Sequence, residues 1–276
     1  MPCCQSWLAV LKAAKRWPDS YNNWAASTTT LLNAMYTNYK DSCNGLKPGD
    51  VWGGCGESKA YNPSYMRTGY MHSFDSFEGG SRWEVMRTRS YTTLGYWYSN
   101  YSLPPDWTNP DGSFNSGNYG YDACRTPWVI GMDYLWWGNS TAKSMDDKIT
   151  ASFAAQGTAA SIGDGYNYSN GTKTSNNHQP EFFGGVGVAS MCGTNSSFRD
   201  ALYTELKTVD KNTYFSDSLR VLYLMAMTGN FQEPCNGGGA PGTPTRTATR
   251  TPTFTASPTP TPAFSLSKSG STSAPT

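Results

Sequence analysis

The segment GYDACRTPWVIGMDYLWW, residues 120–137, carries apolar residues at helical spacing and predicts a long helix. Similar patterns, separated by loops rich in Gly, Asn and Pro, recur at about 5–17, 24–40, 63–77, 81–100, 141–156, 180–192, 196–208 and 214–228. Because helix follows helix with no β-α alternation, we predict an all-α fold with minor β, a toroid of helical hairpins rather than a sandwich.

The stretch between the second and third of these patterns, residues 43–64, interrupts the run of helices. Its Gly53-Gly54 pair predicts the turn of a small β-hairpin insertion. Cys43 and Cys55 flank a Gly- and Pro-rich part of it and can pair in an oxidising compartment, although the sequence leaves the connectivity open. The seven cysteines lack CxxC spacing and only two histidines exist, so we predict no metal site and no cofactor.

The composition excludes several classes of protein. The 276 residues are 37% hydrophobic, 14% aromatic and 15% charged, with a formal net charge of +1. A neutral chain without a basic run argues against nucleic-acid binding, and a mean hydropathy of −0.56 without a long apolar run excludes a membrane span. Tyr (18) and Trp (10) together outnumber Phe (11), and this abundance beside few charges is typical of an extracellular protein that handles sugars.

The two ends of the chain differ from the rest. From about Asn236 to Thr276 there is no Asp or Glu and Thr-Pro repeats dominate, so we predict a folded region over 1–235 and an extended segment over 236–276. That segment is either a linker to a further module or a plain tail. At the other end, Trp7, Leu8 and Leu11 indicate an amphipathic helix, and the pattern of a signal peptide is missing.

The strongest candidate for chemistry is the start of the quoted segment. Asp122 and Arg125 are three residues apart and share one face of a helix. A guanidinium there would hold the carboxylate ionised, as a general base requires. Tyr121 would donate a hydrogen bond to the same carboxylate or to a substrate. The alternative is a helix-start aspartate that pairs with Arg125 and has no catalytic role.

Aromatic residues supply the candidate binding surface. Trp52 lies on a glycine-flanked loop and Tyr65 opens a helix beside a proline, positions from which a ring can stack on the apolar face of a sugar. The tryptophans on helical patterns are expected in the core: Trp7, Trp17, Trp83, Trp128, Trp136 and Trp137. Asp106 and Asp111 lie in a polar loop and are expected to cap turns.

Four ordered segments resemble glycoside hydrolase family 8, which comprises bacterial endoglucanases and relatives. The first two are residues 121–138, similar to the family's central motif, and Asn62-Pro63-Ser64-Tyr65, similar to its N-P-S-Y segment. Leu103-Pro104-Pro105-Asp106-Trp107 resembles its L-x-P-D-W loop, and residues 214–231 resemble its last helix. The similarity covers about residues 7–233.

This resemblance implies an (α/α)6 barrel and an inverting mechanism, in which two carboxyl groups stand roughly 6.5–9.5 Å apart to admit a water. It implies that Asp122 is the general base, that Arg125 and Tyr121 orient the base and contact sugar, and that Trp52, Tyr65 and Tyr214 line subsites. The implied reaction is hydrolysis of internal β-1,4-glucosidic bonds in cellulose or a related β-glucan, by a secreted monomer with a polysaccharide as its partner.

Two departures qualify that expectation. The family's general acid is a Glu in an S-E-G-x-G-like motif, which this sequence lacks, and Met1-Pro2-Cys3-Cys4-Gln5 stands where the family has a T-D-x-D-like stretch. We therefore expect an N-terminally truncated copy of the barrel, without its signal peptide and with little or no hydrolase activity. A non-catalytic carbohydrate-binding remnant is the alternative, as is the same fold acting on xylan, chitosan or mixed-linkage glucan.

Overall fold

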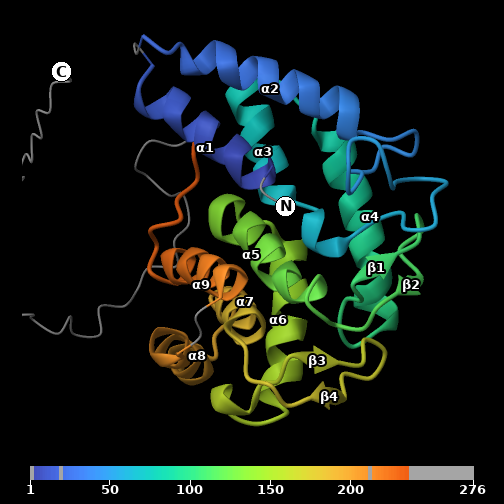
Figure 1. The fold of residues 1–276 in the computed structure, drawn as a ribbon, viewed down its shortest axis with the longest axis vertical. Coiled ribbons are helices and arrows are strands. Elements are labelled where there is room, and N and C mark those ends of the chain that lie inside the picture. Colours follow the sequence, from blue (N-terminus) through green and yellow to red (C-terminus); the bar gives the residue numbers. More distant parts are fainter. Residues whose placement is uncertain (1–2, 19–20, 211–212, 236–276) are drawn as a thin grey trace, which may run out of the picture. The chain divides into compact units, whose positions relative to one another are not determined.

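A computed structural model describes residues 3–18, 21–210 and 213–235, which all belong to one compact unit. Nine α-helices account for most of these described residues (Figure 1). Their bounds are α1 Cys3–Arg16, α2 Trp24–Tyr39, α3 Thr68–Glu78, α4 Glu84–Asn100, α5 Thr126–Trp137, α6 Ser140–Ala154, α7 Pro180–Ser190, α8 Ser196–Thr208 and α9 Tyr214–Met227. The all-α prediction is therefore confirmed, and the predicted tail over 236–276 lies outside the described residues.

The helices form an inner and an outer layer. Along the chain, α1 packs on α2, α3 on α4, α5 on α6 and α7 on α8, which are the expected hairpins. Contacts between hairpins run from α3 to α5, α5 to α7 and α7 to α9, and also from α6 to α7. Every residue of α7 is buried, whereas α2 buries only Thr28, Leu32 and Met35, and Figure 1 shows α2 at the edge of the unit. A helix that is apolar on all sides belongs inside.

Glycines let the inner helices approach one another closely. A Cβ atom at Gly184 of α7 would overlap the ring of Tyr223 on α9, and one at Gly185 would overlap the carbonyl oxygen of Cys124. The segment around Gly184 and Gly185 therefore serves close packing, and it holds α7 directly against the turn that precedes α5.

Two of the predicted helical ranges begin with a 3-10 turn before the α-helix. The pattern over 63–77 divides into a 3-10 turn, η1 (Pro63–Tyr65), and α3, while that over 120–137 divides into η2 (Ala123–Arg125) and α5. Proline occupies the first turn of η1 and of α5, where its missing N–H leaves no hydrogen bond unmade. These turns place Tyr65 and Asp122 at the ends of inner helices.

The predicted hairpin at Gly53-Gly54 is wrong. The strands in the described residues form two other antiparallel pairs, β1 (Trp107–Thr108) with β2 (Phe114–Ser116) and β3 (Gly165–Tyr166) with β4 (Lys173–Ser175). Both Gly53 and Gly54 have positive φ, as a hairpin turn requires, but the chain around them folds onto a side chain. Asp41 accepts the N–H groups of Cys43, Gly45 and Cys55 and the hydroxyl of Tyr61.

Two further expectations about this part of the sequence can be compared with the structure. Cys43 and Cys55 form a disulfide that closes the loop organised by Asp41. Most of the tryptophans expected in the core are buried, namely Trp7, Trp83, Trp128 and Trp136. Trp17 is 56% exposed, which corrects its assignment, because α1 ends at Arg16 and leaves Trp17 beyond the packed face. No helix of the described residues combines the length and apolarity needed to cross a membrane.

Candidate active site

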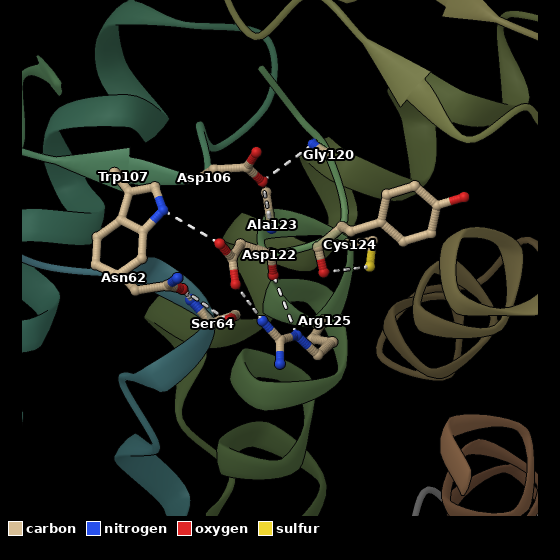
Figure 2. Close-up of polar contacts among 10 residues, drawn as sticks. Asn62, Ser64, Asp106, Trp107, Gly120, Asp122, Ala123, Cys124 and Arg125 are labelled. Atoms are coloured by element: carbon tan, nitrogen blue, oxygen red, sulfur yellow. Dashed lines mark hydrogen bonds and ion pairs between the residues drawn. The ribbon is translucent and has the colours of Figure 1, made fainter. Parts of the chain in front are cut away.

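Asp122 lies immediately before η2, where its carboxylate meets two donors from different parts of the chain. Arg125 donates from Nη2 to Asp122 Oδ1 over 2.6 Å, as the spacing of the two residues predicted. The indole N–H of Trp107 donates to Asp122 Oδ2 over 3.1 Å (Figure 2). Arg125 is almost fully buried, whereas a third of the Asp122 side chain is exposed. The carboxylate is therefore held in place and still open to solvent.

Asp106 lies beside this carboxylate and was expected to cap a local turn. Instead its Oδ1 accepts the N–H groups of Gly120, at 3.1 Å, and of Ala123, at 2.7 Å. Burial raises the pKa of Asp106 to about 6, and the negative charge of Asp122 adds to this rise while the backbone hydrogen bonds oppose it. Asp111 does cap a turn, because it accepts the N–H and hydroxyl of Ser113.

An open cavity of about 540 Å³ lies over these carboxylates. Its lining consists of Asp106, Asn118, Gly120, Tyr121, Asp122, Arg125 and Phe215. Phe215 comes from the first turn of α9, so the cavity joins the start of an inner helix to the turn before α5. A cavity of this size and openness accommodates part of an extended ligand rather than a small molecule held on all sides.

The aromatic side chains predicted to bind sugar form a group beside Asp122. Trp52 is 48% exposed, and its ring centre lies 6.0 Å from that of Trp107. Tyr65 contacts the other side of this group, with its ring centre 6.2 Å from Trp107 and 5.6 Å from the guanidinium carbon of Arg125. Trp52 and Tyr65 thus lie beside the residues that hold Asp122, namely Trp107 and Arg125, although neither belongs to the lining of the cavity.

Two other predicted residues occupy different surroundings. The hydroxyl of Tyr121 donates to Asp164 Oδ2 over 2.7 Å, so the expected hydrogen bond to Asp122 is absent from the structure. Burial and the bond to Asp164 raise the pKa of Tyr121, which therefore stays neutral. Tyr214 is 91% exposed at the start of α9 and does not line the cavity.

Three residues of the site were missed by reasoning from sequence: Asp106, Trp107 and Phe215. The sequence places Asp106-Trp107 in a motif and predicts Asp106 as a turn cap, but it does not link either residue to Asp122, because their contacts reach residues 14 to 17 positions away along the chain. A carboxylate next to an indole N–H donor in a Pro-rich loop was the available signal. Within the described ranges, no group of three or more His, Cys, Asp or Glu residues is placed to hold a metal ion.

Comparison with solved structures first defines the class of fold. The chain superposes with a TM-score of 0.74 on the apo structure of a β-1,3-1,4-glucanase from Paenibacillus sp. X4, at 25% identity over 82% of this chain and 65% of that one. A cold-adapted family 8 xylanase gives a TM-score of 0.68 at 20% identity, over 83% of this chain and 63% of that one. The toroid of helical hairpins is thus the (α/α)6 barrel type.

The chain belongs to glycosyl hydrolases family 8, whose family model matches residues 5–229. It is 36% identical to Endoglucanase A of Acetivibrio thermocellus over 238 residues, which cover 82% of this chain and 49% of that protein. It is 33% identical to Endoglucanase 2 of Ruminiclostridium josui, over 81% of this chain and 50% of that protein. The chain therefore spans about half the length of these curated relatives.

Proposed function

We propose that the chain forms the general-base half of the active site of an endo-acting β-1,4-glucanase. The observation that supports this most directly is the position of Asp122, partly exposed in an open cavity and oriented by Arg125 and Trp107. In inverting hydrolysis a carboxylate takes a proton from the water that attacks the anomeric carbon. Asp122 is the carboxylate suited to that step, and Arg125 and Trp107 keep its oxygens directed toward the cavity.

A neutral β-glucan is the proposed substrate. Trp52 and Tyr65 lie beside Trp107, whose indole donates to Asp122, and aromatic rings stack on pyranose rings without requiring charge. Chitosan would favour additional carboxylates to meet its amino groups, and the cavity lining carries only Asp106 and Asp122. The names of the two relatives above, both endoglucanases, agree with this choice.

We also propose that residues 1–276, tested alone, hydrolyse glucan slowly. An inverting reaction needs a second carboxyl group across the glycosidic bond, to protonate the leaving oxygen. Of the two carboxylates in the cavity lining, Asp106 is engaged by backbone N–H groups next to Asp122. Losing a positioned general acid costs about 10²–10⁴-fold in rate.

The Cys43–Cys55 disulfide supports the related proposal that the protein works outside the cell, where we expect it to be a monomer.

The test is to measure reducing-sugar release from carboxymethyl-cellulose and barley β-glucan by residues 1–276. We expect a rate at least about 10²-fold below that of an intact family member, and loss of the remaining turnover in Asp122→Asn. Asp111→Asn, which alters an exposed carboxylate outside the cavity, is the matched control and should leave the rate unchanged. Rapid turnover that survives Asp122→Asn would contradict the assignment of the base.

Affinity electrophoresis in soluble glucan separates catalysis from binding. The carbohydrate-binding remnant would be favoured if the wild-type chain is retarded but shows no turnover, and if Trp52→Ala abolishes the retardation. Rapid turnover abolished by Asp122→Asn would instead show that the chain holds its own general acid, and would contradict only the proposal of slow hydrolysis.

A further inference from the structure

The carboxylate of Asp106 occupies a space that only glycine leaves open. A Cβ atom at Gly117 would lie 2.6 Å from Asp106 Oδ2, and one at Gly120 would lie 2.7 Å from the same oxygen. Contacts below 3.0 Å essentially never occur for a real Cβ, so either side chain would displace the carboxylate. The turn over residues 117–120 is therefore shaped around Asp106.

Asp106 and the residue after it hold different parts of Asp122. Asp106 accepts N–H groups on both sides of Asp122, from Gly120 and Ala123, and so fixes the backbone from which the Asp122 side chain projects. Trp107 donates its indole N–H to the Asp122 carboxylate itself (Figure 2). One rigid dipeptide thus controls both the position of the main chain and the direction of the carboxylate.

The dipeptide is itself anchored at the edge of the small sheet. The N–H of Asp106 donates to the carbonyl of Asn118 over 2.9 Å, which ties it to the segment it supports. Trp107 begins β1, and Thr108 exchanges backbone hydrogen bonds with Tyr61, at the end of the disulfide-closed loop. Because this support comes from backbone hydrogen bonds to two separate segments, loss of one contact cannot be restored by a simple side-chain rotation.

We propose that Asp106 is a positioning residue for Asp122, and that it acts by holding the 120–123 turn while Trp107 holds the carboxylate. Asp106 is not required to touch the substrate in this role. The inference rests on the proposed function only for its catalytic consequence, because the geometry of the two aspartates can be measured without any turnover.

The test uses the indole N–H resonance of Trp107 in ¹⁵N-labelled residues 1–276, assigned by its disappearance in Trp107→Phe. Neutralising the acceptor with Asp122→Asn should move this resonance, because the indole donates to that carboxylate. In an Asp106→Ala background the same Asp122→Asn change should move it at least about threefold less. Asp106→Asn, which keeps an acceptor oxygen in the same place, should retain most of the response, and Asp111→Asn should retain all of it.

A second variant covers the case in which Asp106→Ala does not fold. Gly120 does not have positive φ, so alanine suits its backbone, and Gly120→Ala pushes directly on the Asp106 carboxylate. It should reduce the Trp107 response as Asp106→Ala does, with the other indole resonances unmoved. A full response to Asp122→Asn in a folded Asp106→Ala or Gly120→Ala protein would overturn the proposal.

Hydrolysis provides a separate measurement. Where turnover is measurable, Asp106→Ala should lower kcat by about 10–10²-fold, as expected for a misplaced catalytic group, with KM within about twofold. Equal kcat in wild type and Asp106→Ala would contradict the positioning role. Absence of turnover in the wild type would count against slow hydrolysis by residues 1–276 alone, and the resonance of Trp107 would still decide the role of Asp106.

Discussion

Arg67 is a buried charged side chain that forms no salt bridge with any of the described residues. It is 5% exposed, and its guanidinium lies against the rings of Trp128, at 4.8 Å, and Tyr70, at 5.3 Å. Within the described chain, its Nε and Nη1 atoms are buried and make no hydrogen bond. Cation–π contacts offset only part of the cost of removing a guanidinium from water. Burial of Arg67 therefore lowers the free energy of unfolding.

Replacing Arg67 by an apolar side chain of similar length should stabilise the protein. We expect Arg67→Met to raise the free energy of unfolding by about 1–3 kcal/mol, since it removes an unpaired buried charge and keeps the packing of the stem. Urea denaturation followed by tryptophan fluorescence measures this change.

The control for this prediction is Arg199→Met. Arg199 pairs with Asp200 on the surface of α8, and its replacement should change the free energy by no more than about 0.5 kcal/mol. A destabilised Arg67→Met protein would mean that the guanidinium makes a favourable interaction that outweighs its desolvation.

At the scale of elements, the loop that presents Trp52 depends on one carboxylate and one disulfide. Asp41 accepts three backbone N–H groups and the Tyr61 hydroxyl, and Cys43–Cys55 closes the same loop. Gly49 lies directly beneath the indole of Trp52, where a Cβ atom would overlap the ring. The exposure of Trp52 to a ligand is thus a property of the whole loop.

Opening the disulfide should release this loop while leaving the helices folded. We expect Cys43→Ser/Cys55→Ser to lower the free energy of unfolding by about 2–3 kcal/mol, the range for closing a short loop. We also expect trypsin to cleave the variant after Lys59 sooner than it cleaves the wild type there. Limited proteolysis with mass spectrometry measures the sites, and reductant should speed cleavage of the wild type but not of the variant. Equal cleavage rates in both proteins would show that Asp41 alone holds the loop.

The helices were predictable from sequence because their apolar residues repeat with a period set by local geometry. Each of the nine predicted ranges contains a helix, and the two largest errors in where a helix begins lie near Pro63 and Pro127, where a 3-10 turn precedes the α-helix. The hairpin was mistaken because the Gly53-Gly54 pattern is local, whereas Asp41, which organises that loop, precedes it by twelve residues or more.

The candidate site, too, was predictable only where its contacts are set by local spacing along the chain. The pair Asp122–Arg125 is set by spacing along one turn and was found from the sequence. The support from Asp106 and Trp107 depends on how two distant segments meet, and no period or spacing encodes such a contact. The hydrogen bond from the hydroxyl of Tyr121 to Asp164 was not foreseen for the same reason, since Asp164 reaches it from a strand-bearing loop more than forty residues away.

At the scale of the whole molecule, burial changes how many protons the folded chain binds. Burial raises the pKa of four aspartates, Asp75, Asp106, Asp133 and Asp146. Asp111 differs, because hydrogen bonds from Ser113 lower its pKa. A carboxyl group with a raised pKa stabilises the folded chain fully below its unfolded pKa of about 3.9, and this contribution is lost as pH rises through the folded value. The four buried aspartates therefore favour the folded state under mildly acidic conditions.

Asp106 allows this effect to be measured for a single group, because its pKa of about 6 defines the pH range over which its contribution to stability changes. The free energy of unfolding of the wild type, minus that of Asp106→Asn, should fall by up to about 3 kcal/mol between pH 4 and pH 7, since each pKa unit corresponds to about 1.4 kcal/mol. Urea denaturation at half-unit pH steps measures the difference. The corresponding curve for Asp111→Asn should be flat above pH 4.5, since a lowered pKa acts only at more acidic pH. A flat curve for Asp106→Asn would mean that Asp106 titrates as it does in the unfolded chain, and that its burial costs the folded state nothing.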